Sequence, residues 1–195
     1  MTVLDEQIWR AGTSTVTCIH VVPEHLVPTL WDIYITAFDQ LRPMAAARQV
    51  LWREEFEQEM ADPRVWKYLA FGADELPVGM ATLTADLQTI PWISPQFYAE
   101  RYPVEHARNA LFYVPFVCTD PRRARAGAMW LLVQAFIERV AAAEGVVGYD
   151  VCAYNNEVVH FADRMDAWNR RLGAHDVMNL DSQNYYVAEY GQGVQ

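Results

Sequence analysis

Cysteine, positive charge and long apolar runs are all scarce in this sequence. The three cysteines among its 195 residues, Cys18, Cys118 and Cys152, stand far apart and lack the CxxC or Cys/His spacing of a zinc site, so no metal is expected. The N-terminus has no basic start followed by an apolar stretch, and an odd number of cysteines without such a leader predicts reduced thiols in the cytoplasm. No apolar run approaches the roughly 18 residues that a membrane span requires, so no membrane partner is expected either.

Basic residues are outnumbered by acidic ones. Fifteen Lys and Arg against 25 Asp and Glu give a net charge of −10, whereas a surface for nucleic acid or anionic lipid needs clustered positive charge. Nucleic acid is therefore excluded as an expected partner. Within this acidic chain, residues 120–132 (DPRRARAGAMWLL) form a local basic island of three arginines among small residues. That contrast favours a small anionic ligand over an anionic polymer.

The apolar patterning predicts a single domain over residues 1–195 in which strands and helices alternate. Hydrophobic residues make up 52% of the chain, enough for one sizeable core. Strands are expected at 14–22, 65–72, 77–86, 110–120 and 146–155, with a closing hairpin of 175–180 and 183–190, and helices at 24–41, 48–63, 127–143 and 157–173. The unit of strand, helix and strand at 110–154 should be parallel with a right-handed crossover.

An insertion rich in proline and aromatic residues, at about 87–109, separates the hairpin from the next strand. Three prolines prevent one long element there, while large apolar side chains supply contact surface: Trp92, Ile93, Phe97, Tyr98 and Tyr102. One interpretation is a lid or wall around a bulky acceptor or acyl chain. The other is a dimer surface or an extra layer of core.

The basic island stands where the 110–120 strand gives way to the 127–143 helix. Pro115 interrupts the strand and predicts a bulge or splay, because proline has no ladder donor. A helix N-terminus offers free backbone N–H groups and partial positive charge, and small residues allow a phosphate to approach them. Arginines add charged hydrogen bonds. The alternative is a basic loop that caps a core helix.

This order of elements, with an arginine-rich turn before the 127–143 helix, resembles the GNAT superfamily of acyl-CoA-dependent acyltransferases. The signature of that family is Arg or Gln, two residues, Gly, one residue, then Gly or Ala, directly after its fourth strand. RARAGA matches it from Arg123 to Ala128, with Ala126 at the first glycine position and Gly127 one place late. The resemblance implies the α/β (α+β) class, with a mixed, mostly antiparallel twisted sheet of six to seven strands and flanking helices.

The resemblance also implies a coenzyme site. The splayed fourth strand would offer backbone groups of Phe116 and Val117 to the pantetheine arm, and Asn156, or its neighbour Asn155, matches an asparagine that the family carries after its fifth strand. The tyrosine that usually protonates the leaving thiolate falls at Asn169, so that acid is absent. The residues that would hold the pyrophosphate of coenzyme A are Arg123, Ala124, Arg125, Ala126, Gly127 and Ala128.

Three side chains are candidates for the catalytic work. Acyl transfer to an amine needs a base for the acceptor and polarisation of the thioester carbonyl. Tyr113, in the 110–120 strand, is a candidate to face the acyl group, with a place in the core as the alternative. His106, just before that strand, is a candidate base. His160, with Asp163 three residues later, is another, and its alternative is a surface ion pair.

Other reactive residue types have simpler interpretations. Cys118 has no identifiable His/Asp partner, which favours a small buried hydrophobe over a nucleophile. Glu54 and Glu55 belong to the 48–63 helix, which lines the acceptor side in the family, but they equally suit a solvated face.

Together these residues predict transfer of an acyl group, acetyl foremost, from acyl-CoA to the amine of a small molecule by direct attack in a ternary complex. Acetyl-CoA or another acyl-CoA is the expected co-substrate, and the expected partners are a small-molecule amine and, left open, a second copy of the chain. The alternative is a GNAT-fold protein without transferase activity that binds an acyl-CoA or a protein partner. A third is another acyl-thioester enzyme, such as a decarboxylase or an O-acyltransferase.

Overall fold

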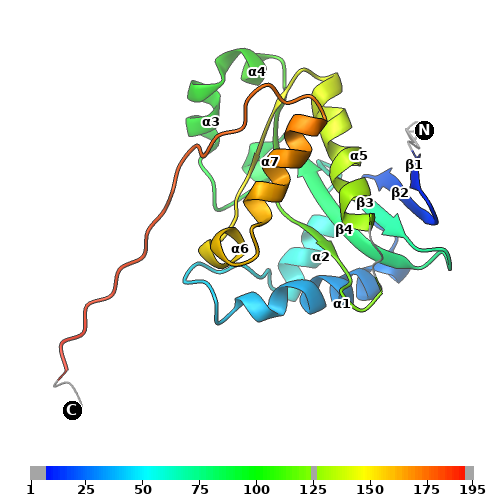
Figure 1. The fold of residues 1–195 in the computed structure, drawn as a ribbon, viewed down its shortest axis with the longest axis horizontal. Coiled ribbons are helices and arrows are strands. Elements are labelled where there is room, and N and C mark those ends of the chain that lie inside the picture. Colours follow the sequence, from blue (N-terminus) through cyan, green and yellow to red (C-terminus); the bar gives the residue numbers. More distant parts are fainter. Residues whose placement is uncertain (1–7, 124–126, 192–195) are drawn as a thin grey trace.

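One mixed sheet organises the protein (Figure 1). The computed structural model describes residues 8–123 and 127–191, and within them seven strands join in the order β1-β2-β3-β4-β5-β7, with β6 also paired to β4. All pairs are antiparallel except β5 and β7, which are parallel, so the mixed, mostly antiparallel sheet is confirmed. The strands are β1 (Ile8–Ala11), β2 (Ser14–Ile19), β3 (Val65–Phe71), β4 (Pro77–Thr84), β5 (Leu111–Val114), β6 (Val117–Thr119) and β7 (Val146–Tyr149).

Helices cover both faces of this sheet (Figure 1). One face, here the α5/α7 face, packs against α5 (Ala128–Ala142) and α7 (Phe161–Arg171). The other, the α1/α2 face, packs against α1 (Val27–Phe38) and α2 (Arg53–Ala61). The shorter helices are η1 (Glu24–Leu26), η2 (Asp39–Leu41), η3 (Leu87–Thr89), α3 (Pro95–Arg101), α4 (Pro103–Ala107) and α6 (Ala153–Glu157).

The alternation of side chains along the strands supplies both cores. On β3, Tyr68 belongs to the core under α5, while Leu69 belongs to the core under α1 and α2. Successive residues of a strand point to opposite faces, so one strand can build two apolar layers. The hairpin of β3 and β4 follows the prediction, as does α1, whose Pro28 stands in the first turn.

Pro115 divides the predicted 110–120 strand into β5 and β6. Both pair with β4, through Thr84↔Tyr113 and Ala81↔Val117. On the other side, β5 pairs with β7 as far as Val114↔Tyr149, and within the described residues β6 has no strand on that side. The strand that contains β5 and β6 therefore leaves β7 beyond Val114, which confirms the predicted splay.

Several predicted boundaries need correction. Helix α2 begins at Arg53 rather than at 48, because the Glu55 carboxylate accepts a hydrogen bond from the Trp52 N–H (2.8 Å) and fixes the start there. The predicted 157–173 helix is divided into α6 and α7, with His160 in the left-handed region between them (φ 54°). The predicted buried strand at 146–155 ends at Tyr149 and is half-buried, because β7 lies at the edge of the sheet.

The predicted closing hairpin at 175–190 is wrong. Residues 174–191 contain no strand, and residues 181–191 are all exposed. Figure 1 shows this segment passing the insertion and then leaving the body of the protein. Alternating side chains are a local signal, whereas a strand exists only where a second strand pairs with it. No helix of the described residues is long and apolar enough to cross a membrane.

Candidate functional site

The N-terminus of α5 is the predicted phosphate position. Ala124, Arg125 and Ala126 lie outside the described residues, while Arg123, Gly127 and Ala128 lie within them. Gly127 is the N-cap residue with φ 104°, and a Cβ atom placed there would meet no atom of the described residues within 4 Å. Among the described residues no side chain caps this end of the helix. The described residues provide no capping side chain for the N–H groups of the first turn, and Gly127, just before them, has no side chain. This arrangement suits an anion.

Arg122 and Arg123 make ion pairs with the protein's own carboxylates. Arg122 donates to Asp120 (2.8 Å), which is buried, and to Asp32 (2.6 Å). The hydrogen bond from Arg122 lowers the pKa of Asp120. Arg123 pairs with Asp74 (2.6 Å), and both side chains are exposed, 36% and 56%. An exposed pair is weak, so an incoming phosphate can compete for Arg123 at small cost.

The two residues predicted to contact the pantetheine arm differ. The Phe116 carbonyl accepts a hydrogen bond from the Thr82 N–H (3.0 Å), and its ring packs against Tyr34 and Phe56. The Phe116 carbonyl is therefore already used in the sheet, and its place in the pantetheine site stays a prediction. Because hydrogen-bonding direction alternates along an antiparallel strand, the N–H and C=O of Val117 point away from β4, toward the side where β6 has no strand.

Asp150 follows β7 directly, at the point where β5 and β7 stop pairing. Its Oδ1 accepts hydrogen bonds from the Tyr113 hydroxyl (2.5 Å) and from the Trp92 ring N–H (3.1 Å). The Tyr98 ring stands edge-on to Tyr113, with centroids 6.0 Å apart. Asp150 itself is exposed. We call Trp92, Tyr98, Tyr113 and Asp150 the aromatic–carboxylate cluster.

Two features hold this cluster in place. Tyr113 is buried, and burial, followed by the charge of Asp150, raises the pKa of its hydroxyl, so that it remains a donor. At Gly148, a Cβ atom would lie 2.9 Å from the Tyr113 ring and 3.0 Å from the Tyr98 ring. Only glycine lets both rings rest on the backbone of β7.

Sequence reasoning selected Tyr113 but missed Asp150 and Trp92. The available signal was weak: Asp150 is the first charged residue after an apolar strand, a place where many ordinary loop residues occur. Trp92 lies 58 positions away in the sequence, and only the folded insertion brings it to the carboxylate.

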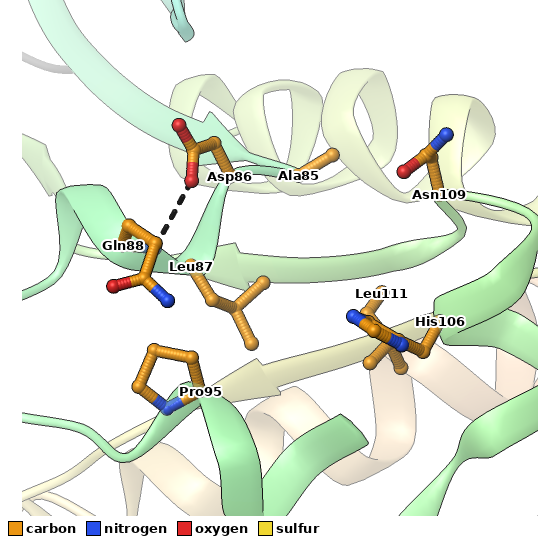
Figure 2. Close-up of a pocket in the computed structure, with 8 residues that line it drawn as sticks. All are labelled: Ala85, Asp86, Leu87, Gln88, Pro95, His106, Asn109 and Leu111. Carbon is orange, nitrogen blue, oxygen red and sulfur yellow. Dashed lines mark hydrogen bonds between the residues drawn. The ribbon is translucent and has the colours of Figure 1, made fainter.

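The described structure also has a small hollow of about 260 Å³ (Figure 2). It opens between the insertion and β5, and Leu111 on its wall is two residues before Tyr113 on the same face of the strand. His106, from α4, is exposed and lines it. The lining residues are Ala85, Asp86, Leu87, Gln88, Pro95, His106, Asn109 and Leu111.

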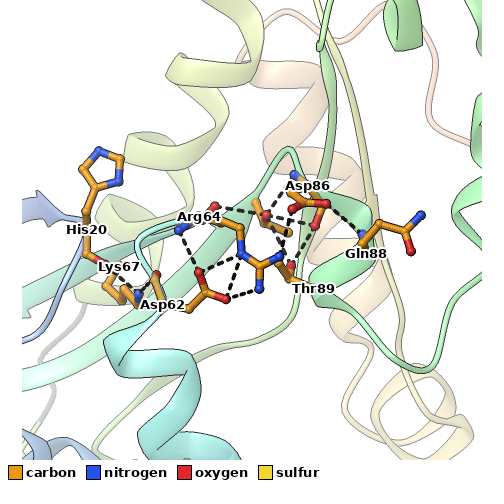
Figure 3. A network of polar contacts seen from close by, with 8 residues as sticks. His20, Asp62, Arg64, Lys67, Asp86, Gln88 and Thr89 are labelled. Carbon is orange, nitrogen blue, oxygen red and sulfur yellow. Dashed lines mark hydrogen bonds and ion pairs between the residues drawn. The ribbon is translucent and has the colours of Figure 1, made fainter.

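A polar network anchors the first residues of the insertion (Figure 3). Arg64 binds Asp62 (2.6 Å) and Asp86 (3.2 Å), and Asp86 in turn accepts from the Gln88 N–H (3.1 Å). Buried Lys67 donates to the carbonyls of His20 (2.7 Å) and Asp62 (2.5 Å). The turn before β3 is thus tied to the wall of the hollow.

The remaining candidates belong to α6, α7 and the residue before α7. His160 is exposed and pairs with Asp163 at 3.4 Å, which agrees with the surface ion-pair alternative. Asn156 is exposed on α6. Asn169 is buried, and its side-chain amide donates to the Met165 carbonyl (2.8 Å), so it holds α7 rather than a leaving group.

The surroundings of Cys118 and Glu55 favour structural roles for these residues. Cys118 is buried, and burial raises the pKa of its thiol to about 12, which removes it as a nucleophile. Glu55 pairs with Arg48 (2.5 Å) and caps α2, and Glu54 is exposed. Among the described residues no group of three or more His, Cys, Asp or Glu could hold a metal ion.

Comparisons with known proteins point in one direction. No protein-family model and no curated sequence matches the chain. Two of the similar solved structures are a candidate acetyltransferase from Pyrococcus horikoshii (12% identity, TM-score 0.55, covering 79% of this chain and 88% of that one) and an aminoglycoside acetyltransferase from an uncultured soil metagenomic sample, in complex with trehalose (13%, 0.51, 90% and 97%). The latter enzyme was also solved in complex with sisomicin (13%, 0.50, 90% and 97%). At such identities the likeness concerns the fold alone, and this chain has the fold of the GNAT superfamily of acetyltransferases.

Proposed function

We propose that the protein transfers an acyl group, acetyl foremost, from acyl-CoA to the amine of a small molecule by direct attack in a ternary complex. Two features support it: an α5 N-terminus for which the described residues provide no side-chain cap, and the exposed Asp150 carboxylate, held by Tyr113 and Trp92 where β5 and β7 stop pairing. An anion and an amine could meet between them.

The acyl-CoA side consists of α5, Arg123 and β6. The amides of the first turn of α5 and the guanidinium of Arg123 would hold the pyrophosphate, and the Val117 backbone would bind the pantetheine amides. When bound, acyl-CoA supplies the activated acyl thioester. The open space beside Gly127 fits this role, because a phosphate must come close to the helix N–H groups.

The acceptor side consists of Asp150 and the hollow. The two hydrogen bonds to Oδ1 fix the carboxylate, and its exposure leaves it able to bind the ammonium of an acceptor. Tyr113 is buried and acts as a positioning residue, because its hydroxyl reaches Asp150 rather than solvent. A hollow of about 260 Å³ is just below the usual size of a drug-sized ligand site, which favours a small acceptor.

The proposed reaction requires no covalent intermediate on the protein. The ammonium loses one proton, the amine nitrogen attacks the thioester carbonyl carbon, and the carbon–sulfur bond breaks. The thiolate takes a proton from water, and the hydroxide that remains takes the second proton from the nitrogen, which leaves a neutral amide and a thiol. His106 is the candidate to receive the first proton, since it lines the hollow. Water as the final acid is consistent with Asn169, which stands where the family has a tyrosine and whose amide is bound to Met165.

The experiment has two arms. Acetyl-CoA should raise the thermal unfolding temperature, and ADP or ATP should raise it far less, because ligands that bind only the native state stabilise it. Thiol release from acetyl-CoA is then measured with a panel of small amines. Stabilisation with no thiol release for any amine would support the second candidate, a GNAT-fold protein that binds an acyl-CoA or a protein partner without catalysis; the observation in its favour is Asn169. Absence of stabilisation by any acyl-CoA would contradict both.

A further inference from the structure

The hollow between the insertion and β5 is lined by hydrogen-bonding side chains that the proposed reaction does not use. Gln88, from η3, and Asn109, two residues before β5, both line it (Figure 2), and both are exposed. Among the described residues, neither side-chain amide has a hydrogen-bond partner. The left-handed backbone of Asn109 (φ 54°) gives that asparagine a local reason to be there, whereas Gln88 has no such reason. The two amides are therefore available to a ligand.

The one carboxylate among the described lining residues of the hollow is already paired. Asp86 accepts the Gln88 N–H at its Oδ1 (3.1 Å) and pairs with Arg64 through its Oδ2 (3.2 Å; Figure 3). No lysine or arginine belongs to this described lining. An ammonium only donates hydrogen bonds and a carboxylate only accepts them, whereas an amide side chain does both. The matching ligand group is therefore neutral and both donates and accepts, as a hydroxyl or a carboxamide does.

Two elements of the fold connect the hollow to the aromatic–carboxylate cluster. On β5, Leu111 lines the hollow, and Tyr113, which holds Asp150, follows two residues later on the same face, about 7 Å along the strand. On α3, Pro95 lines the hollow, and Tyr98, whose ring meets Tyr113, follows three residues later. Residues three apart are neighbours on the surface of a helix. A ligand held by the carboxylate is therefore within reach of the hollow.

We propose that the acceptor carries, besides its amine, a neutral group that both donates and accepts hydrogen bonds, and that the hollow binds this group through Gln88 and Asn109. The inference rests on the proposed function, because Asp150 would hold the ammonium at the other end of the acceptor. A distance of about 7 Å corresponds to about six bonds of an extended chain. The apolar side chains of Leu87 and Leu111 would contact the carbon atoms between the two ends.

Binding of amines that differ only at their far end tests this assignment. The neutral probes are aminopentanol, with its two groups at opposite ends, and δ-aminovaleramide; the others are hexylamine, cadaverine and δ-aminovalerate, which end in a methyl, an ammonium and a carboxylate. At least one neutral probe should bind about tenfold more tightly than these three, through the added hydrogen bonds. It should also shift the side-chain amide signals of Gln88 and Asn109 in the NMR spectrum of the isotope-labelled protein. Equal Kd values for all five probes, or tighter binding of a charged one, would overturn the proposal.

Thiol release from acetyl-CoA with the same amines separates this inference from the proposed function. Selective binding of a neutral probe without thiol release would contradict the proposed transfer and support the assignment of the hollow. Thiol release from all five amines with equal kcat/KM would support the transfer and overturn the assignment.

Two variants locate the contact. Gln88→Leu removes the amide and keeps a side chain of similar size, and Asn109→Gly removes the amide at a position whose positive φ suits glycine. At least one should lower the preference for the tighter neutral probe over hexylamine, measured as the ratio of their Kd values, at least fivefold. Gln96→Leu, at an exposed glutamine of α3 outside the described lining, is the matched control and should keep the ratio. All three side chains are exposed, so the unfolding temperature should stay the same. A wild-type ratio in both Gln88→Leu and Asn109→Gly would overturn the proposal.

Discussion

The two faces of the sheet bury different kinds of side chains. Toward α5 and α7, β3, β4 and β5 present Tyr68, Leu83, Phe112 and other apolar or aromatic side chains. Toward α1 and α2, the same strands bury polar groups, and four of these share that face: Lys67, Thr82, Thr84 and Tyr113. A buried polar group costs free energy unless it is paired, so a face that holds several of them is arranged for something other than stability alone. The candidate acceptor site lies on this second face.

The largest effect on stability should come from the α5/α7 face. Phe136 is fully buried on α5 and its ring meets Tyr68 edge-on, with centroids 6.3 Å apart. Phe136→Ala should lower the free energy of unfolding by about 3–5 kcal/mol, because it removes buried apolar contact and leaves a cavity. Phe97→Ala, at a ring that is 43% exposed, is the control and should cost far less. Urea unfolding measures the free energy of unfolding of both variants. Equal losses would contradict the expected difference between the core and the insertion.

The largest effect on activity should come from the α1/α2 face. Asp150→Asn keeps the shape of the side chain but removes the charge that would bind an ammonium, and kcat/KM for the amine should fall about 100-fold, or about 3 kcal/mol. The Kd for acetyl-CoA, measured by calorimetry, should change less than twofold. Asp163→Asn, at an exposed carboxylate on α7, is the matched control. A fall in coenzyme affinity as large as the fall in kcat/KM would move Asp150 out of the acceptor site.

The α1/α2 face also predicts an unusual dependence of stability on pH. Burial raises the pKa of Glu59 on α2 from 4.5 to about 7, opposed by the charge of Lys67, and the Oε1 atom of Glu59 is buried without a hydrogen-bond partner among the described residues. Between these pH values the folded state binds more protons than the unfolded state, so stability falls as pH rises from about 4.5 to about 7. Burial lowers the pKa of Lys67 to about 8. Above that pH the folded state binds fewer protons at Lys67 than the unfolded state does, so the free energy of unfolding rises again.

Glu59→Gln should abolish the acidic part of this slope. Relative to the wild type, the variant should gain about 1–3 kcal/mol of stability between pH 4.5 and pH 7.5, measured by urea unfolding at each pH. Glu57→Gln, at an exposed glutamate of the same helix that pairs with Arg53, should leave the slope unchanged. A Glu59→Gln profile parallel to that of the wild type would show that this carboxylate is solvated in the folded protein.

The smallest effect should come from the end of α5, where the charges are exposed. Arg123→Ala should weaken acetyl-CoA binding about tenfold, through the loss of one charged hydrogen bond, and should leave kcat little changed at saturating coenzyme. Asp74→Asn should tighten binding slightly, since it frees Arg123 from its ion pair. Arg53→Ala, on α2, is the control. If Arg123→Ala leaves the Kd for acetyl-CoA unchanged, the phosphate binds elsewhere at the N-terminus of α5.

Much of the fold could be predicted from the sequence because its signals are local. The 3.6-residue apolar period of α5, the turn that joins β3 and β4 in a hairpin, and Pro115 each act within a few residues of the chain, and the structure bears out all three. The signal for the proposed coenzyme side is equally local, since RARAGA is one continuous stretch. The cluster was not, because Trp92, Tyr113 and Asp150 come from an insertion, an inner strand and the end of an edge strand.

By itself, the sequence determined most of the central helices and strands and a basic turn before a long helix, because period, proline and charge act over a few residues. Only the tertiary structure decided that Asp150 would meet Tyr113 and Trp92, that the Glu59 Oε1 atom would be buried, and that residues 183–190 would form no strand. Those outcomes depend on which strands become neighbours, and a pattern read along one chain does not contain that information.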